Sequence, residues 1–191
     1  PDWNTIKYVD SCLKLYKESL GLYDFTDMLA EFVRQSDKYC PQFDLCFLDE
    51  AQDLSPLQWD IAHILDKHSD RMYAAGDDDQ AIYRWAGADV EQFINLPGGS
   101  ETLSQSYRVP ERVHQLAGKV VKRIKRRFPK KYEPKNEPGN ITRINSVNSL
   151  DMSDGSWLIL SQAAYQLIPV AYDLKSGGYL FNYRGQRSIS E

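Results

Sequence analysis

The sequence predicts an α/β fold in which a parallel sheet is covered by helices. Helical and strand-like segments alternate through the N-terminal half, an order typical of parallel sheets with helical crossovers. The two strand-like apolar runs, residues 43–48 and 71–75, each end at a group of acidic residues. Because ligands bind beyond the carboxyl ends of parallel strands, we expect the functional residues at that edge.

The helices of the N-terminal half are predicted from apolar spacing and from residues suited to helix ends. Gly21 can end the first helix in the left-handed conformation, Asp24 can cap the second, and Pro56 is suited to the first turn of the third. Apolar residues recur every three or four positions in the first of them. The helices expected in this half span residues 5–20, 24–34, 55–65 and 89–94.

The C-terminal half is predicted to open with one long helix from Pro110 to Phe128, because its apolar residues follow helical spacing. Three prolines in residues 128–139 indicate a loop. The remaining elements expected are strands at 141–147, 157–160 and 179–183 and a helix at 162–174.

Composition and charge limit the class of protein. Of the 191 residues 42% are apolar, enough for a core, but no apolar stretch reaches the ~18 residues of a membrane span. The three cysteines form no CxxC pair, so a reduced, cytoplasmic setting without membrane contact is expected. Residues 1–111 hold 21 acidic and 9 basic side chains, a net −12, whereas residues 112–191 hold 6 and 14, a net +8. This division indicates a carboxylate-rich half and a half that meets a polyanion.

Asp49 and Glu50 directly follow the first apolar run. Such a pair is suited to nucleoside triphosphate hydrolysis: Asp49 would hold Mg²⁺, directly or through water, and Glu50 would orient and deprotonate the attacking water. A bare Asp-Glu pair can also do no more than end a strand, so the neighbouring motifs decide between these interpretations.

Three ordered segments supply those motifs. Residues 48–55 are Leu-Asp-Glu-Ala-Gln-Asp-Leu-Ser, residues 76–89 are Gly-Asp-Asp-Asp-Gln-Ala-Ile-Tyr-Arg-Trp-Ala-Gly-Ala-Asp, and residues 103–110 are Leu-Ser-Gln-Ser-Tyr-Arg-Val-Pro. In this order they resemble the superfamily 1 DNA helicases of the UvrD/Rep/PcrA type. Further segments that resemble this family are residues 23–29, 157–160 and 178–185.

The resemblance implies ATP and Mg²⁺ as cofactors and assigns roles around the nucleotide. Gln80 would contact the γ-phosphate and a water, although outside this motif it would be an ordinary turn glutamine. Arg108 would be an arginine finger, because a guanidinium keeps its charge and can bond two phosphate oxygens; a plain surface salt bridge is the alternative. Asp49, Glu50, Gln80 and Arg108 are therefore the candidate ATP-binding residues.

The resemblance also implies single-stranded DNA and duplex junctions as partners, and 3′–5′ translocation; protein partners are not indicated. Tyr83 and Trp85, with Arg84 between them, are expected to meet DNA, and in an extended segment both rings would point to the same side. Ala86 departs from the family, which commonly has Arg there. A basic run over residues 119–131 is either a solvated helix face or a phosphate-contacting surface, and Lys122, Arg123 and Arg126 are its candidate DNA contacts. Tyr183, Arg184 and Gly185 are weaker candidates.

The phosphate-cradling motif G-x-x-x-x-G-K-[ST] is not found in the sequence. The expectation is therefore a central fragment of a helicase acting in DNA repair or replication. Residues 1–103 would be the latter part of a first RecA-like motor domain, and residues 104–191 the opening of a second. Two alternatives are a helicase-derived DNA-binding or regulatory protein without catalysis, and a metal-dependent nuclease that uses Asp49, Glu50 and the three acids at 77–79.

Overall fold

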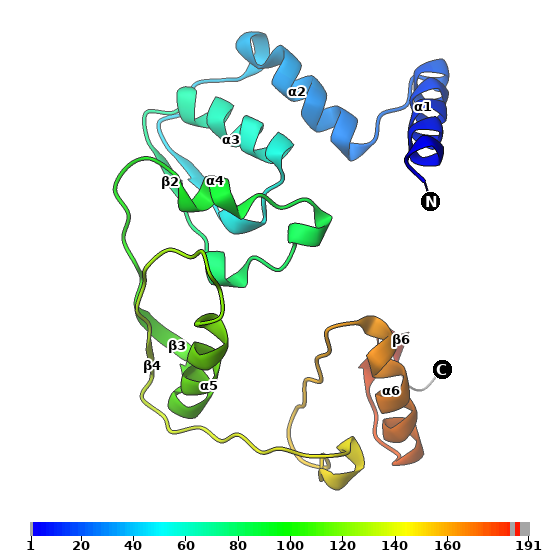
Figure 1. The fold of residues 1–191 in the computed structure, drawn as a ribbon, viewed down its shortest axis with the longest axis vertical. Coiled ribbons are helices and arrows are strands. Elements are labelled where there is room, and N and C mark those ends of the chain that lie inside the picture. The colour runs from blue at the N-terminus through cyan, green and yellow to red at the C-terminus, as the bar shows by residue number, and fades with distance from the viewer. Residues whose placement is uncertain (1, 184–185, 188–191) are drawn as a thin grey trace. The chain divides into compact units, whose positions relative to one another are not determined.

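The computed structural model describes residues 2–183 and 186–187. Contacts divide the chain into two compact units, residues 1–137 and 138–191, and each is described by itself (Figure 1). None of the helices in the described part combines the length and apolar composition that a bilayer crossing requires.

The first unit begins with two capped helices. α1 (Trp3–Leu20) ends at Gly21, which has a φ of 62° in the left-handed region, as the sequence predicts. α2 (Phe25–Tyr39) begins at Asp24, which forms a reciprocal capping box with Asp27. The cap at Asp24 is confirmed, and the helix continues past the expected residue 34.

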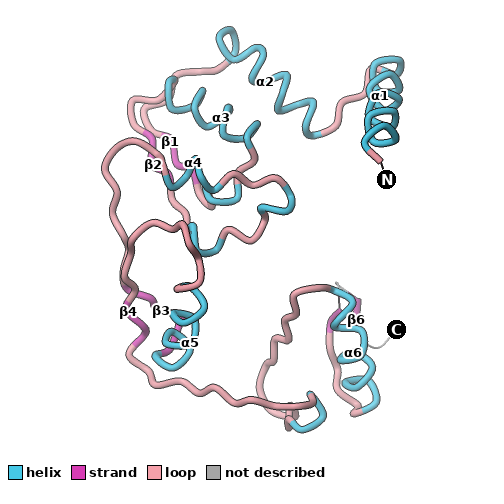
Figure 2. The backbone as a smooth tube through the Cα atoms, in the orientation of Figure 1, coloured by secondary structure: helices cyan, strands magenta, loops and turns pink. Residues whose placement is uncertain are grey.

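A parallel pair of strands follows. β1 (Cys46–Leu48) and β2 (Met72–Ala74) pair in parallel, and α3 (Pro56–Lys67) connects them (Figure 2). The ladder continues past the strands, since the Ala75 N–H donates to the Leu48 carbonyl at 2.7 Å. The predicted α/β class and parallel pairing are confirmed, although both strands are shorter than predicted.

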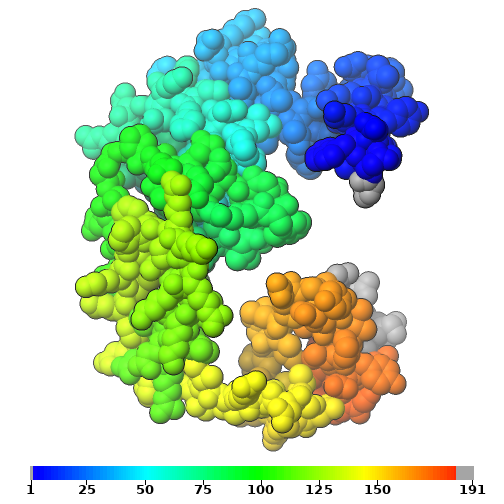
Figure 3. Space-filling view, viewed as in Figure 1, coloured from blue at the N-terminus to red at the C-terminus, as the bar shows by residue number. Residues whose placement is uncertain are grey.

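The core of this unit lies where α3 packs behind the strand pair. Ala51, Trp59 and Ala62 are buried, and the Trp59 indole Nε1 donates to the Asp89 carbonyl at 3.1 Å just before α4 (Val90–Ile94). Figure 3 shows the segments from α3 to α4, cyan to green, as one continuous mass. The partly buried apolar side chains packed around this core are Leu48, Leu54, Met72, Phe93 and Leu96.

A second parallel pair completes the unit. β3 (Gln105–Pro110) leads directly into α5 (Glu111–Val121) and pairs with β4 (Glu133–Lys135). The prediction of one helix to Phe128 is wrong, because α5 ends at Val121. The prediction of a loop over 128–139 is wrong where β4 forms. Pro129 disfavours a helical conformation only at the preceding residue, Phe128, so it does not account for the end of α5 at Val121.

The second unit contains α6 (Leu167–Ser176) and an antiparallel hairpin of β5 (Asn182–Tyr183) and β6 (Gln186–Arg187). The predicted helix at 162–174 is confirmed only in part. The strands predicted at 141–147 and 157–160 are wrong, because in the described part of this unit only β5 and β6 pair. A strand gains its ladder bonds only from a neighbour, so apolar spacing alone does not form one.

Candidate functional site

Asp49 and Glu50 lie exposed immediately after β1, at its carboxyl end. The Glu50 N–H donates to Asp49 Oδ1 at 2.9 Å. Glu50 has φ 52° and ψ 38°, the only positive φ of a non-glycine residue within residues 2–183 and 186–187. Such a conformation costs about 1–3 kcal/mol and persists only where the surroundings hold it.

Gln52 connects Glu50 to the acidic turn that follows β2. It lies in a short 3-10 helix, η1 (Ala51–Asp53), and is 1% exposed. Its Nε2 donates to Glu50 Oε2 at 2.7 Å, and its Oε1 accepts the Asp77 N–H at 2.9 Å. One buried amide therefore joins the two sequence motifs.

Gly76 gives this amide its space. A Cβ at this position would lie 2.5 Å from Gln52 Oε1 and 3.2 Å from the Ala51 nitrogen. Real Cβ atoms essentially never come as close as the first distance, so any other residue here would displace the Gln52 side chain. Glycine is required here by close approach rather than by backbone conformation.

Gln80 lies at the other end of the same hydrogen-bonded chain. Its Nε2 donates to Asp77 Oδ2 at 2.8 Å, while Asp77 Oδ1 accepts the Asp79 N–H at 3.1 Å. A continuous path thus runs from Glu50 through Gln52 and Asp77 to Gln80. Asp77 thus also satisfies an amide of its own turn.

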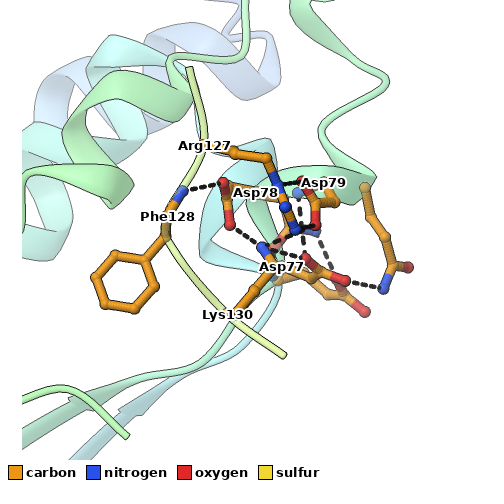
Figure 4. A network of polar contacts seen from close by, with 9 residues as sticks. Asp77, Asp78, Asp79, Arg127, Phe128 and Lys130 are labelled. Atoms are coloured by element: carbon orange, nitrogen blue, oxygen red, sulfur yellow. Dashed lines mark hydrogen bonds and ion pairs between the residues drawn. The ribbon is translucent and has the colours of Figure 1, made fainter. Parts of the chain in front are cut away.

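The acidic turn is bound by a segment that follows α5. Arg127 contacts both carboxylate oxygens of Asp79, at 2.8 and 2.6 Å. Lys130 binds Asp77 at 2.7 Å and also binds Asp78. Figure 4 shows the two cations turned toward the three carboxylates.

Backbone and burial reinforce this ion network. The Phe128 N–H donates to Asp78 Oδ2 at 2.7 Å, and the side chains of Lys130 and Asp78 are 5% and 2% exposed. Three carboxylates face two cations, so their charges are largely compensated. A sequence of three adjacent acids therefore has a structural explanation.

The pKa values within the network follow from these contacts. Burial acts to raise the pKa of Asp77, but the hydrogen bonds from Lys130 and Gln80 outweigh it and hold that pKa below its ordinary value. Burial acts to lower the pKa of Lys130, but its bonds to Asp77 and Asp78 raise it. The bond to Asp79 raises the pKa of Arg127.

The basic run does not form one continuous surface, so its interpretation as a single helix face is wrong. Arg127 and Lys130 bind the acidic turn, and Arg126 Nε lies 2.6 Å from Glu91 Oε2. Lys122 and Arg123 are exposed, and in the described part of the chain neither has an ion-pair partner. Three cations are paired with acids because the chain leaves the helix after Val121.

The aromatic pair lies in a turn rather than an extended segment. Arg84–Ala86 form a 3-10 helix, and the ring centroids of Tyr83 and Trp85 are 6.5 Å apart with planes at 46°. Trp85 is 83% exposed and Tyr83 46%. Arg84 points to Glu91, at 3.4 Å, so Glu91 binds both Arg84 and Arg126.

Arg108 lies exposed on β3, and its side chain has no ion-pair partner among the described residues. Over the part of the chain that the structure describes, no hydrogen bond or ion pair joins the Arg108 side chain to the path from Glu50 to Gln80. Tyr183 donates its hydroxyl to the Ala164 carbonyl at 3.2 Å, whereas Arg184 and Gly185 lie outside the described residues.

Sequence reasoning missed Gln52, Asp77 and the cations of the ion network as organising residues. The Gln of the Ala-Gln-Asp triplet was a signal for the first, since it lies two residues from Glu50. No local pattern indicated the pairing of Lys130 with Asp78, which are 52 positions apart.

Comparison with known proteins places these motifs in context. A model of the UvrD/REP helicase N-terminal domain matches residues 1–98. ATP-dependent DNA helicase PcrA of Bacillus subtilis is 31% identical over 128 residues, which are 60% of this chain and 17% of that protein. DNA helicase II of Escherichia coli is 29% identical over 127 residues, 60% of this chain and 17% of that protein. PcrA of Leuconostoc citreum is 31% identical over 89 residues, 44% of this chain and 12% of that protein. The chain thus spans less than a fifth of the length of these curated relatives.

Proposed function

The chain belongs to the UvrD/REP helicase family, and from this premise we propose that it is part of an ATP-dependent DNA helicase. The parent protein moves 3′ to 5′ on single-stranded DNA and acts at duplex junctions. Residues 1–103 form the latter part of a first RecA-like motor domain, and residues 104–191 open a second. The names of the relatives support the helicase class.

The observation that carries this proposal is the hydrogen-bonded path from Glu50 through Gln52 and Asp77 to Gln80. It ties together the ends of two neighbouring parallel strands, the edge at which α/β sheets bind ligands. An Asp-Glu pair at one end of the path and an exposed amide at the other match the needs of phosphoryl transfer to water.

In this proposal Glu50 accepts the proton of the water that attacks the γ-phosphate of ATP. Its exposed carboxylate has one oxygen held by Gln52, which leaves the other for the water. Gln80 exchanges its bond to Asp77 for one to the γ-phosphate, and so senses whether that phosphate is present. Arg108 supplies positive charge to the same phosphate from the second motor domain.

The donor set at Asp49 fits Mg²⁺. Asp49 is exposed, and within the described part of the chain its side chain accepts one hydrogen bond, at Oδ1 from the Glu50 N–H. A single carboxylate together with phosphate oxygens and waters is an ordinary magnesium site. When bound, Mg²⁺ supplies charge neutralisation for the phosphates.

The DNA contact is proposed at Tyr83 and Trp85, because exposed aromatic rings stack on bases without regard to sequence. Trp85 at 83% exposure has a free face for such a stack. Arg84 and Arg126 bind DNA phosphates after leaving their ion pairs with Glu91. Lys122 and Arg123 are already exposed.

A second candidate is a helicase-derived DNA-binding or regulatory protein without catalysis. Ala86 favours it, since the family commonly has Arg at that position. The nuclease alternative loses support, because the carboxylates of Asp78 and Asp79 are bound by Lys130 and Arg127 and are not available to a pair of metal ions.

The test is DNA-stimulated ATP hydrolysis by the longer protein encoded in frame with this chain. We expect a lysine-bearing phosphate loop upstream and hydrolysis that rises with single-stranded DNA. Gln80→Ala should remove most of the hydrolysis, whereas Gln42→Ala, at an exposed glutamine outside the site, should not. A longer protein that binds DNA but hydrolyses no ATP would favour the non-catalytic candidate.

A further inference from the structure

Gln52 is buried and uncharged, and it lies between two turns that carry carboxylates. We propose that it is a positioning residue, which sets the backbone of Glu50 and locks the turns after β1 and β2 in one register. The part of this inference that concerns hydrolysis rests on the proposed role of Glu50. The part that concerns the geometry of the two turns depends only on the contacts of Gln52.

The first argument is that the Gln52 amide has one satisfactory orientation. Its NH₂ donates to Glu50 Oε2 at 2.7 Å and more weakly to Asp53 Oδ2 at 3.4 Å, both acceptors, and its carbonyl faces the Asp77 N–H, a donor. Turning the amide over would place oxygen against oxygen and donor against donor. Because Gln52 is 1% exposed, water cannot repair that mismatch, so both contacts are made together or lost together.

The second argument is the conformation of Glu50. A glutamate has no intrinsic preference for a φ of 52°, so its neighbours must hold it. The Glu50 N–H binds Asp49 Oδ1, and its carbonyl accepts the Asp53 N–H at 3.0 Å. These two bonds lie within the turn itself, whereas the bond from Gln52 anchors the Glu50 side chain to a buried group. In the proposal, loss of that anchor releases Glu50 from its positive φ.

The third argument is that the second turn is shaped around this amide. Gly76 leaves the volume that Gln52 Oε1 occupies, and the next N–H along the chain, that of Asp77, points at the oxygen. Since Asp77 also binds Gln80, a displacement of Gln52 moves both ends of the path. Gln52 thus couples the position of the water-activating carboxylate to that of the phosphate-sensing amide.

The experiment uses the 191-residue chain and nuclear magnetic resonance, so no enzymatic activity is required. The intraresidue amide-to-α-proton NOE of Glu50 reports its positive φ, and hydrogen exchange of the Asp77 N–H reports the second contact. Three variants are compared: Gln52→Leu removes all the side-chain bonds of Gln52, Gln52→Glu keeps only the acceptor for Asp77, and Gln92→Glu is the matched control. Gln92 also donates to a carboxylate, that of Asp89, but lies outside the site.

We expect Gln52→Leu to weaken the Glu50 NOE and to speed exchange at Asp77 about tenfold, the loss of one hydrogen bond. Gln52→Glu should weaken the NOE alone, and Gln92→Glu should change neither. The Ala75 N–H, in the strand ladder, should keep its exchange rate.

An unchanged Glu50 NOE in both Gln52 variants would overturn the proposal. A rise in the exchange rate of the Ala75 N–H as large as that of the Asp77 N–H would also overturn it, because Gln52 would then only support the core. Neither result would bear on the proposed role of Glu50, which is tested by measuring ATP hydrolysis.

Discussion

Trp85 is 83% exposed, although tryptophan is among the residues that gain most from burial. The ring lies beside Tyr83 in a turn that closely follows Gln80. An exposed aromatic pair next to the proposed phosphate-sensing residue is suited to coupling the nucleotide state to DNA. The proposed DNA contact would account for the exposure of this side chain.

Trp85→Ala should weaken binding of single-stranded DNA by about 1–3 kcal/mol, the contribution of one base stack. The loss should be similar at every salt concentration, because stacking releases no counterions. A fluorescence titration with a labelled oligonucleotide measures it, and Trp3→Ala, at a tryptophan 75% exposed on α1, is the control. If Trp85→Ala binds like the parent, the DNA-facing surface is not this turn.

Glu91 holds two of the proposed phosphate contacts, Arg84 and Arg126. Glu91→Gln should free both guanidinium groups, raise the affinity for DNA, and steepen the salt dependence by roughly 0.7 in log–log slope per added phosphate contact. Glu101→Gln removes the same charge from an exposed site without releasing an arginine. Equal slopes for the two variants would mean that Glu91 does not restrain these arginines.

For individual residues, the sequence predicted position better than contacts. Asp49 and Glu50 follow β1 at its carboxyl end, as expected, whereas Trp85 lies in a turn rather than in an extended segment. The bonds of Gln52 and Lys130 could not be predicted, because they join residues 25 and 52 positions away. Such pairings depend on how the strands and turns meet in space, which no local pattern encodes.

Among the elements, the acidic turn and the segment after α5 depend most on each other. Asp78 and Lys130 are both nearly inaccessible, and burying such charges is unfavourable unless they are paired. The segment carrying Arg127 and Lys130 therefore adopts the path that reaches the acids, rather than the helix that its apolar spacing predicts.

Lys130→Met should destabilise the first unit by about 3–5 kcal/mol, because it leaves a buried carboxylate without its partner. Chemical denaturation measures the change in the free energy of unfolding. Lys131→Met, at the exposed neighbouring lysine, should change it by less than about 0.5 kcal/mol. Equal effects of the two substitutions would contradict the buried network.

The free energy of unfolding should depend on pH through the ionisation of Asp77. Its pKa in the folded chain lies below the ordinary value of 3.8, so the ionised form contributes stability above pH 3.8 that is lost as the pH falls further. Lys130, with its pKa above 10.5, contributes stability that is lost only at higher pH. Unfolding midpoints measured from pH 2 to 7 should fall more steeply for the parent than for Asp77→Asn. Parallel curves for the two proteins would show that the ionised carboxylate of Asp77 does not stabilise the fold.

The elements predicted best are those with local end signals. Gly21, Asp24 and Pro56 mark the ends of helices that form as expected, because caps act within one turn. The strands predicted at 141–147 and 157–160 are wrong, because a strand needs a partner and nothing in its own residues supplies one.

At the scale of the whole chain, charge and apolar surface support the proposed role within a larger motor. The acidic first part, net −12, contains the carboxylates of the site, and the basic remainder, net +8, contains Lys122 and Arg123. α1 has an apolar face but contributes no buried residue. The chain spans 17% of the length of PcrA from Bacillus subtilis, so the motor activity belongs to the proposed parent protein.

The measurement that tests this account most directly is hydrolysis and binding of ATP by that parent protein carrying Glu50→Gln. The account predicts that hydrolysis falls by about 100-fold or more, the usual contribution of a general base, while ATP binds with the affinity of the parent. Glu101→Gln, outside the site, should leave both quantities unchanged. Hydrolysis by Glu50→Gln at the parental rate would contradict the account, because Glu50 would then not be the residue that activates water.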